Sequence, residues 1–205
     1  SSVSQNRKTI IVGEDLGNVP EGFRPALKKA DVLGYRVLYF EDVGPDLLRA
    51  SKSPSLSLAC LSTHDLPPLL GWWDEDDIAF SQDQGWLDND AAELLHEERL
   101  ERKEAMLRTA IDGGFLSHEA MAALERKDPQ PEIVIGLHRL LAHTNSLLVA
   151  PRLADMVGER RSTNVPGTSE EYPNWRLKLD VPLEDLAGHD LFTAISRAMA
   201  SERPR

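Results

Sequence analysis

Residues 56–65 read Leu56-Ser57-Leu58-Ala59-Cys60-Leu61-Ser62-Thr63-His64-Asp65, a short, mainly apolar run that ends in polar and charged side chains. An apolar run without strict alternation is typical of a strand that is buried on both faces, as in a parallel sheet. In parallel α/β proteins, ligands bind outside the carboxyl ends of the strands. The stretch therefore predicts a buried strand that presents His64 and Asp65 to a ligand.

Other apolar runs in the chain have the same design. They are Thr9–Val12 before Gly13-Glu14-Asp15, residues 35–40 before Glu41-Asp42, and residues 146–149 before Ala150-Pro151-Arg152. Together with residues 56–61, they predict four parallel strands connected by helices, that is, an α/β fold.

Periodic and capped segments fill most of the remaining chain. We expect helices over residues 20–30, 91–112, 117–126 and 132–142, with Pro20 in a first turn, Ser117 as an N-cap and Gly113-Gly114 as a stop. Residues 74–145 are therefore predicted to be a helical insertion between the third and fourth strands.

Charge and cysteine content exclude several classes of protein. Asp and Glu outnumber Lys and Arg by 34 to 23, and the resulting net charge of −11 repels phosphate backbones, so no nucleic-acid partner is expected. Cys60 is the only cysteine, which excludes an intramolecular disulfide and a cysteine metal cluster. The lack of a long apolar run argues against a membrane partner, and both features favour a cytoplasmic protein.

The first candidate site is Gly13-Glu14-Asp15-Leu16-Gly17, in which glycines flank an acid pair at a strand end. Glycines allow a sharp turn and close approach of a ligand, so one acid could donate a proton while the other supports the turn. The alternative is a simple strand-to-helix turn whose acids cap the helix that begins near Pro20.

The second candidate is the pair His64-Asp65. On an extended segment, adjacent side chains point to opposite sides, which predicts that the two fan out around a ligand and do not form a hydrogen-bonded dyad. The alternatives are a buried structural histidine beside a turn-capping aspartate, or a metal phosphohydrolase. The other histidines show no compact ligand spacing, so no metal site is expected.

Two aromatic and amide-rich segments follow. Trp72-Trp73 could stack on sugar rings, but we expect at least one of them in the core. The loop Thr163–Ser169, followed by Tyr172-Pro173-Asn174-Trp175, offers neutral hydrogen-bonding groups that suit polyhydroxylated ligands. A rigid surface loop whose asparagines cap turns is the alternative.

Taken together, these motifs resemble the amylomaltase, or disproportionating enzyme, family of 4-α-glucanotransferases. Gly13–Gly17 resembles the family's fifth-strand motif, Thr63–Pro67 with Gly71–Trp73 resembles its seventh-strand motif, and Asn164–Thr168 with Tyr172–Arg176 resembles the loop beyond its eighth strand. The resemblance covers nearly the whole chain and implies the C-terminal half of a (β/α)8 TIM barrel, strands five to eight.

The resemblance also implies roles for four residues. Glu14 would be the general acid/base, and Asp65 would bind sugar hydroxyls and stabilise an oxocarbenium-like transition state. His64 and Asn164 would contact the sugar. The implied reaction is a retaining transfer of α-1,4-glucan segments between maltooligosaccharides, which uses no cofactor.

The nucleophile of this reaction is not found in the sequence. In the family it is an Asp in an Arg-x-Asp-His segment, and this segment does not occur in the 205 residues. We therefore expect the chain to be part of a larger enzyme, to be inactive alone, and to associate with the missing half or with itself through unpaired strand edges. A non-catalytic glucan-binding or assembly module is the alternative.

Overall fold

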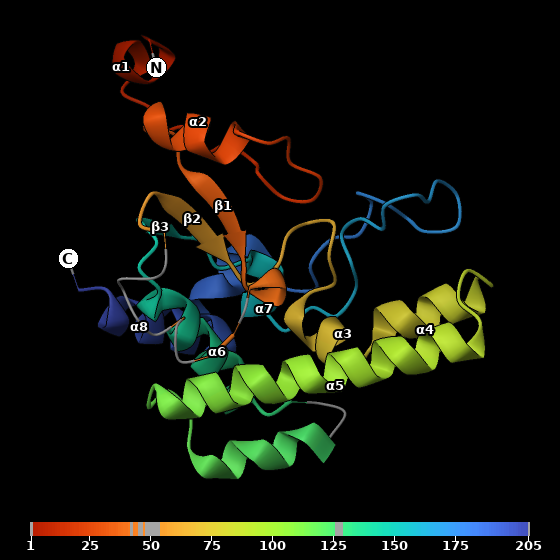
Figure 1. Cartoon of the computed structure of the whole chain (residues 1–205). Coiled ribbons are helices and arrows are strands. Elements are labelled where there is room, and N and C mark those ends of the chain that lie inside the picture. Colours follow the sequence, from red (N-terminus) through yellow and green to blue (C-terminus); the bar gives the residue numbers. More distant parts are fainter. Residues whose placement is uncertain (1, 42, 45–46, 48–53, 126–128, 205) are drawn as a thin grey trace.

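A computed structural model describes residues 2–41, 43–44, 47, 54–125 and 129–204 of the chain. A small sheet lies at the centre, with α1 (Ser2–Arg7) and α2 (Phe23–Lys29) on one side of it. The long helix α5 (Asn89–Asp112) crosses on the opposite side (Figure 1). Asp42 and Arg126, which the sequence placed at the end of a strand and of a helix, lie outside the described residues.

The sheet is parallel throughout its described strands. It consists of β1 (Gly34–Val37), β2 (Ser57–Cys60) and β3 (Leu148–Val149) in the order β1-β2-β3. A single parallel bridge between Val12 and Leu33 continues the pairing beyond β1. The predicted α/β class with parallel strands is therefore confirmed, and the four predicted segments lie side by side in their order along the chain.

All four predicted strands are shorter than expected, and β2 loses only one residue at each end. The run Thr9–Val12 forms only the isolated bridge, because the backbone pairs with one neighbour through two hydrogen bonds, Gly13 N to Leu33 O (2.7 Å) and Leu33 N to Ile11 O (3.0 Å). Beyond Val37, the chain leaves the sheet as the 3-10 turn η1 (Leu38–Phe40).

An aromatic contact explains why β1 ends at Val37. The Tyr39 ring stacks on the Trp72 ring with centroids 4.5 Å apart, so Leu38 and Tyr39 are buried in the core while Phe40 is exposed. Strand β3 is also shortened: Ser146 is not part of it, and its hydroxyl instead accepts a hydrogen bond from that of Ser57 (2.9 Å).

Every named element between β2 and β3 is helical. The remaining helical elements of the described chain are α3 (Leu69–Trp73), α4 (Asp76–Asp83), η2 (His118–Glu125), α6 (Pro131–His143), α7 (Leu153–Met156), η3 (Leu183–Gly188) and α8 (Asp190–Glu202). None of the helices in these ranges is long and apolar enough to cross a lipid bilayer. That residues 74–145 are an insertion into a barrel stays a prediction.

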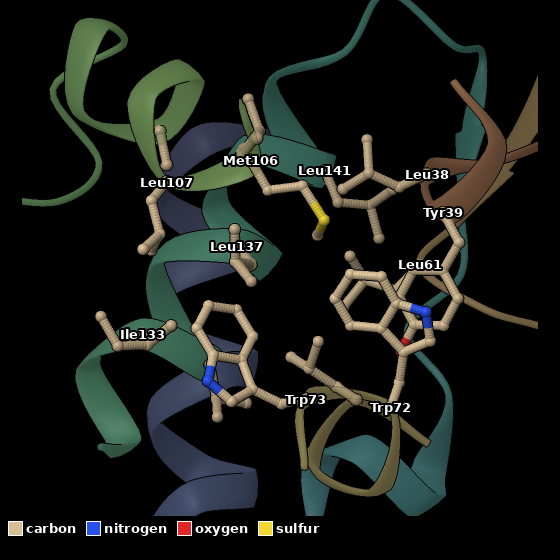
Figure 2. Close-up of a cluster of buried hydrophobic side chains, with 14 of the residues drawn as sticks. Leu38, Tyr39, Leu61, Trp72, Trp73, Met106, Leu107, Ile133, Leu137 and Leu141 are labelled. Atoms are coloured by element: carbon tan, nitrogen blue, oxygen red, sulfur yellow. The ribbon is translucent and has the colours of Figure 1, made fainter. Parts of the chain in front are cut away.

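The core lies between the sheet, α3, α5 and α6 (Figure 2). Trp72 and Trp73 are both buried in it, with 6% and 1% of their surface exposed, and Leu137 of α6 is fully buried. The prediction that at least one tryptophan is core is confirmed, and neither is available as a sugar platform.

The core also contains a buried histidine on α6. His138 is fully buried, and its Nδ1 lies 2.8 Å from the carbonyl oxygen of Val134, one helical turn earlier. Burial lowers the pKa of His138, and the charge of the nearby Asp155 carboxylate opposes this change only in part. The imidazole is therefore neutral in the folded chain near neutral pH.

This burial predicts a specific dependence of stability on pH. An unfolded histidine has a pKa of about 6.5, so below this pH the unfolded chain binds more protons than the folded chain and the free energy of unfolding falls. The variant His138→Gln should lose this part of the pH dependence. Urea unfolding of both proteins between about pH 7.5 and about pH 5.5 measures it, and equal losses of stability would contradict the prediction.

Candidate active site

Three loops that carry the sequence motifs extend to the same side of the sheet. Figure 1 shows the loop after Val12, the loop between β2 and α3, and the long loop after α7 on this side. Because the strands are parallel, their carboxyl ends share one edge, and the segments that leave them begin close together. The candidate site is built from these loops.

His64 and Asp65 lie on a tight turn. The backbone N–H of Leu66 donates to the carbonyl oxygen of Thr63 (3.2 Å), and the N–H of Asp65 donates to the Thr63 hydroxyl (3.2 Å). The prediction that the pair points to opposite sides is wrong, because the segment is not extended here. The turn instead brings His64 Nε2 to 3.4 Å from Asp65 Oδ1.

Asn164 completes this group from the distant loop. Its side-chain amide Nδ2 donates a hydrogen bond of 2.7 Å to Asp65 Oδ1. The side chains of His64 and Asp65 remain 59% and 46% exposed, so a ligand can reach both. The structure therefore brings together three of the four predicted site residues on an accessible surface.

The loop that carries Asn164 is held by its own polar groups. Asn174 accepts a hydrogen bond from Val165 N (2.8 Å) and donates to the hydroxyl and carbonyl oxygens of Thr168 (2.7 and 3.1 Å). The N–H of Trp175 donates to Thr163 O (3.0 Å). The interpretation of Asn174 as a turn-bracing residue is confirmed, and the loop is a rigid support for Asn164.

Trp175 is a feature that the sequence interpretation missed. It has a left-handed backbone with φ of 61°, its surface is 63% exposed, and its ring centroid lies 5.2 Å from that of His64. A left-handed bulky residue is strained and tends to mark a functional position. The sequence signal was the aromatic residue directly after the bracing Asn174, but the strain is visible only in the structure.

The acid pair after Val12 divides into two roles. Asp15 is buried, and its carboxylate accepts hydrogen bonds from Tyr35 N (2.8 Å) and Arg24 Nε (3.1 Å). Glu14 is exposed. Helix α2 begins after Gly22 without a side-chain cap, so the alternative that these acids cap it is wrong. Asp15 supports the turn, and Glu14 is left available to a ligand.

The charge of Glu14 contributes to the raised pKa of Tyr35 in β1. Burial raises the pKa of the Tyr35 phenol, a hydrogen bond with the Cys60 thiol and the negative charge of Glu14 raise it further, and the positive charge of Arg152 opposes them. Within the described ranges, no hydrogen bond joins Glu14 to His64, Asp65 or Asn164, so their convergence on one ligand stays a prediction.

The polar groups here do not form a recognisable cation site. In the ranges that the structure describes, no three side chains of His, Cys, Asp or Glu are grouped so that they could hold a metal ion. The site thus consists of carboxylate, imidazole and amide groups around an exposed indole, a set that can hydrogen-bond and stack on a sugar.

The two neighbouring acids should respond differently to substitution. Asp15→Ala leaves the partly buried Tyr35 N–H without its acceptor and should lower the free energy of unfolding by about 2 kcal/mol. Glu14→Gln keeps the shape of an exposed side chain and should change stability by less than about 0.5 kcal/mol. Urea unfolding measures both, and equal effects of the two variants would overturn the division of roles.

Comparison with known proteins gives a consistent result. The family model for 4-alpha-glucanotransferase, glycoside hydrolase family 77, matches residues 1–183. A 4-alpha-glucanotransferase from Mycobacterium tuberculosis is 35% identical over 202 residues, which cover 96% of this chain and 27% of the relative. The Haemophilus influenzae 4-alpha-glucanotransferase is 31% identical over 180 residues, 88% of this chain and 26% of the relative.

Solved structures support the same assignment. The crystal structure of amylomaltase from Corynebacterium glutamicum superposes with a TM-score of 0.83 at 31% identity and covers 96% of this chain and 29% of that one. The amylomaltase from Streptococcus agalactiae, solved in complex with acarbose, is similar in fold alone, with a TM-score of 0.57 at 16% identity. The chain spans about a quarter of the length of the curated relatives named above. It belongs to the 4-alpha-glucanotransferase family.

Proposed function

We propose that this chain provides one part of the active site of a 4-α-glucanotransferase that transfers α-1,4-glucan segments between maltooligosaccharides. The observation that supports this most strongly is the 2.7 Å hydrogen bond from Asn164 to Asp65, which joins two distant motifs into one exposed polar group beside His64. Family membership supplies the reaction, and the geometry supplies a surface suited to a neutral sugar.

The proposed roles follow from charge and exposure. Asp65 accepts hydrogen bonds from sugar hydroxyls and stabilises positive charge that develops at the anomeric carbon, while Asn164 holds one carboxylate oxygen in place. His64 contacts the same sugar. Glu14, exposed after the Val12 segment on the far side of β1 from β2, protonates the leaving oxygen and later deprotonates the incoming sugar hydroxyl.

A retaining transfer also needs a carboxylate nucleophile, about 5–5.5 Å from the acid. The family's Arg-x-Asp-His segment is absent from this sequence. We therefore propose that the chain alone does not catalyse transfer, and that the nucleophile comes from another part of the catalytic domain.

The proposed context is a (β/α)8 barrel in which the Val12 segment, β1, β2 and β3 are strands five to eight and residues 74–145 are a helical insertion. The parallel order of these segments supports this placement. A cytoplasmic location, with maltodextrin metabolism as the setting, is part of the same proposal and is favoured by the single, buried cysteine.

A second candidate function is a glucan-binding module without catalysis. The absence of the nucleophile segment favours it, because Asp65, His64 and Asn164 can hydrogen-bond a sugar without any covalent step. The two proposals differ in catalysis. The first predicts a product whose formation requires Glu14, and the second predicts sugar binding without any product.

A hybrid enzyme separates the two functions. Residues 1–183 replace the matching segment of the Mycobacterium tuberculosis relative, and transfer is followed as glucose and longer glucans formed from maltotriose. The hybrid should be active. Glu14→Gln and Asp65→Asn should each lower kcat by about 10²–10⁴-fold, because they remove a proton-transfer group or a charge.

The matched control is Glu21→Gln, an exposed acid in the same loop as Glu14, which should leave kcat unchanged. The chain alone should form no product. Full activity of the Glu14→Gln hybrid would refute the catalytic proposal. Maltotriose binding by the isolated chain, with an inactive hybrid, would favour the binding module.

We also propose that the edge beside Val12 is covered by the rest of the family's catalytic domain, since the chain spans 27% of its Mycobacterium tuberculosis relative. Ile10 and Val12 are 56% and 37% exposed there, next to a backbone that is paired on one side only. Without this cover, the isolated chain should self-associate.

Light scattering during gel filtration tests this expectation. The chain should elute as a dimer or larger species, and Ile10→Lys should shift it toward the monomer, because a charge on the edge opposes strand pairing. Leu183→Lys, at a residue that is 72% exposed outside the sheet, is the control and should leave the elution unchanged. A monomeric wild-type chain at high concentration would contradict the proposal.

A further inference from the structure

Arg152 lies between β3 and α7 and makes hydrogen bonds to both loops of the candidate site. We infer that Arg152 is a positioning residue: it locks the turn that carries His64 and Asp65 to the loop that carries Asn164. The structural role of this lock is independent of the proposed function. Only its consequence for glucan transfer rests on the proposed function.

The first half of the lock is the grip on the turn. Arg152 Nη1 donates to the carbonyl oxygens of Thr63 and Leu66, both at 2.8 Å, and lies 3.4 Å from the Ser62 hydroxyl. Thr63 and Leu66 flank His64-Asp65 on both sides. One nitrogen therefore fixes the two ends of the dipeptide, and the turn cannot open without losing both bonds.

The second half is the bond to the distant loop. Arg152 Nη2 donates to the Thr163 hydroxyl at 2.9 Å. Thr163 directly precedes Asn164, and its carbonyl oxygen accepts the N–H of Trp175 (3.0 Å). The same guanidinium thus holds the backbone on which both Asn164 and the exposed indole are placed.

Helix α7 adds a second support three residues further along. Asp155 is buried, and its Oδ1 accepts a hydrogen bond of 2.6 Å from the N–H of Leu69, at the start of α3. The segment from Ser62 to Leu69 is therefore fixed at both ends by side chains of one short element. Its free part is the exposed turn with His64 and Asp65.

Arginine is the residue type that this arrangement requires. In the described part of the chain, the hydrogen bonds of Arg152 all go to neutral oxygens and none of its contacts is an ion pair. A guanidinium offers five donors in a rigid plane, so its two terminal nitrogens can serve two loops at once. A lysine ammonium is a single point and cannot span both sets of acceptors.

The consequence is a preorganised pair of functional groups. With both loops tied to one guanidinium, the Asn164–Asp65 hydrogen bond forms without ordering either loop when a ligand binds. Without the lock, Asp65 and Asn164 would stay on their loops, but the two loops could move relative to each other. Even small misplacements of catalytic groups lower the reaction rate strongly.

Amide hydrogen exchange on the 205-residue chain, without sugar, tests the lock. The reporters are the N–H groups of Leu66 and Trp175, one in each loop, and the reference is Leu137 in the core. Arg152→Met should raise exchange of both reporters by about tenfold or more while exchange at Leu137 changes by less than about twofold. Arg152→Lys should protect at most one of the two loops.

Coupling between the loops is tested by removing the far contact. Thr163→Val eliminates one acceptor of Arg152 and should raise exchange at Leu66 by about threefold, but should add nothing in the Arg152→Met background. Arg160→Met is the matched control: it removes contacts with Asp74 and Asp76 near the same loop and should leave Leu66 unchanged.

Several results would overturn the inference. If amide exchange in Arg152→Met rises equally at Leu66, Trp175 and Leu137, the variant is destabilised as a whole. If exchange rises in one loop alone, Arg152 makes separate contacts and does not couple the loops. If Arg152→Met does not fold, an unchanged Leu66 in Thr163→Val would refute the coupling by itself. Because no sugar is present, these results are independent of whether the chain takes part in glucan transfer.

Discussion

Parallel pairing of four successive segments is the constraint from which the candidate site follows. The Val12 bridge, β1, β2 and β3 run in the same direction, so the chain leaves each of them at one edge. Residues far apart in the sequence, such as Asp65 and Asn164, can therefore meet at 2.7 Å. A different strand order or direction would separate these loops, and no property of the individual motifs could bring them together.

In two of the motifs, one residue is used by the fold and its neighbour is left exposed. Asp15 is buried and bonded to Tyr35 N, whereas Glu14 faces solvent. Asn174 braces its loop, whereas Trp175 is exposed and strained. In both motifs the hydrogen bonds of one residue support the fold, and the adjacent side chain stays exposed.

The sequence was sufficient where local rules agree with tertiary packing. The apolar runs predicted the parallel segments, and the helices over 91–112 and 132–142 appear nearly as expected. It was insufficient where packing overrides local pattern. The stacking of Tyr39 on Trp72 ends β1 early, and the turn at Thr63 places His64 beside Asp65 instead of opposite to it. The role of Arg152 could not be predicted either, because its acceptors are mainly backbone carbonyl oxygens that become its neighbours only in the folded chain.

The central claim is that Glu14 and Asp65 face one sugar-binding surface. Titration of the chain with maltotriose, followed by backbone amide NMR, tests it most directly. The account predicts saturable shifts of two separate groups of amides, residues 13–17 and residues 63–66, with a single Kd, and the loss of both in Asp65→Asn. Saturable shifts at residues 63–66 while residues 13–17 remain unchanged would contradict it.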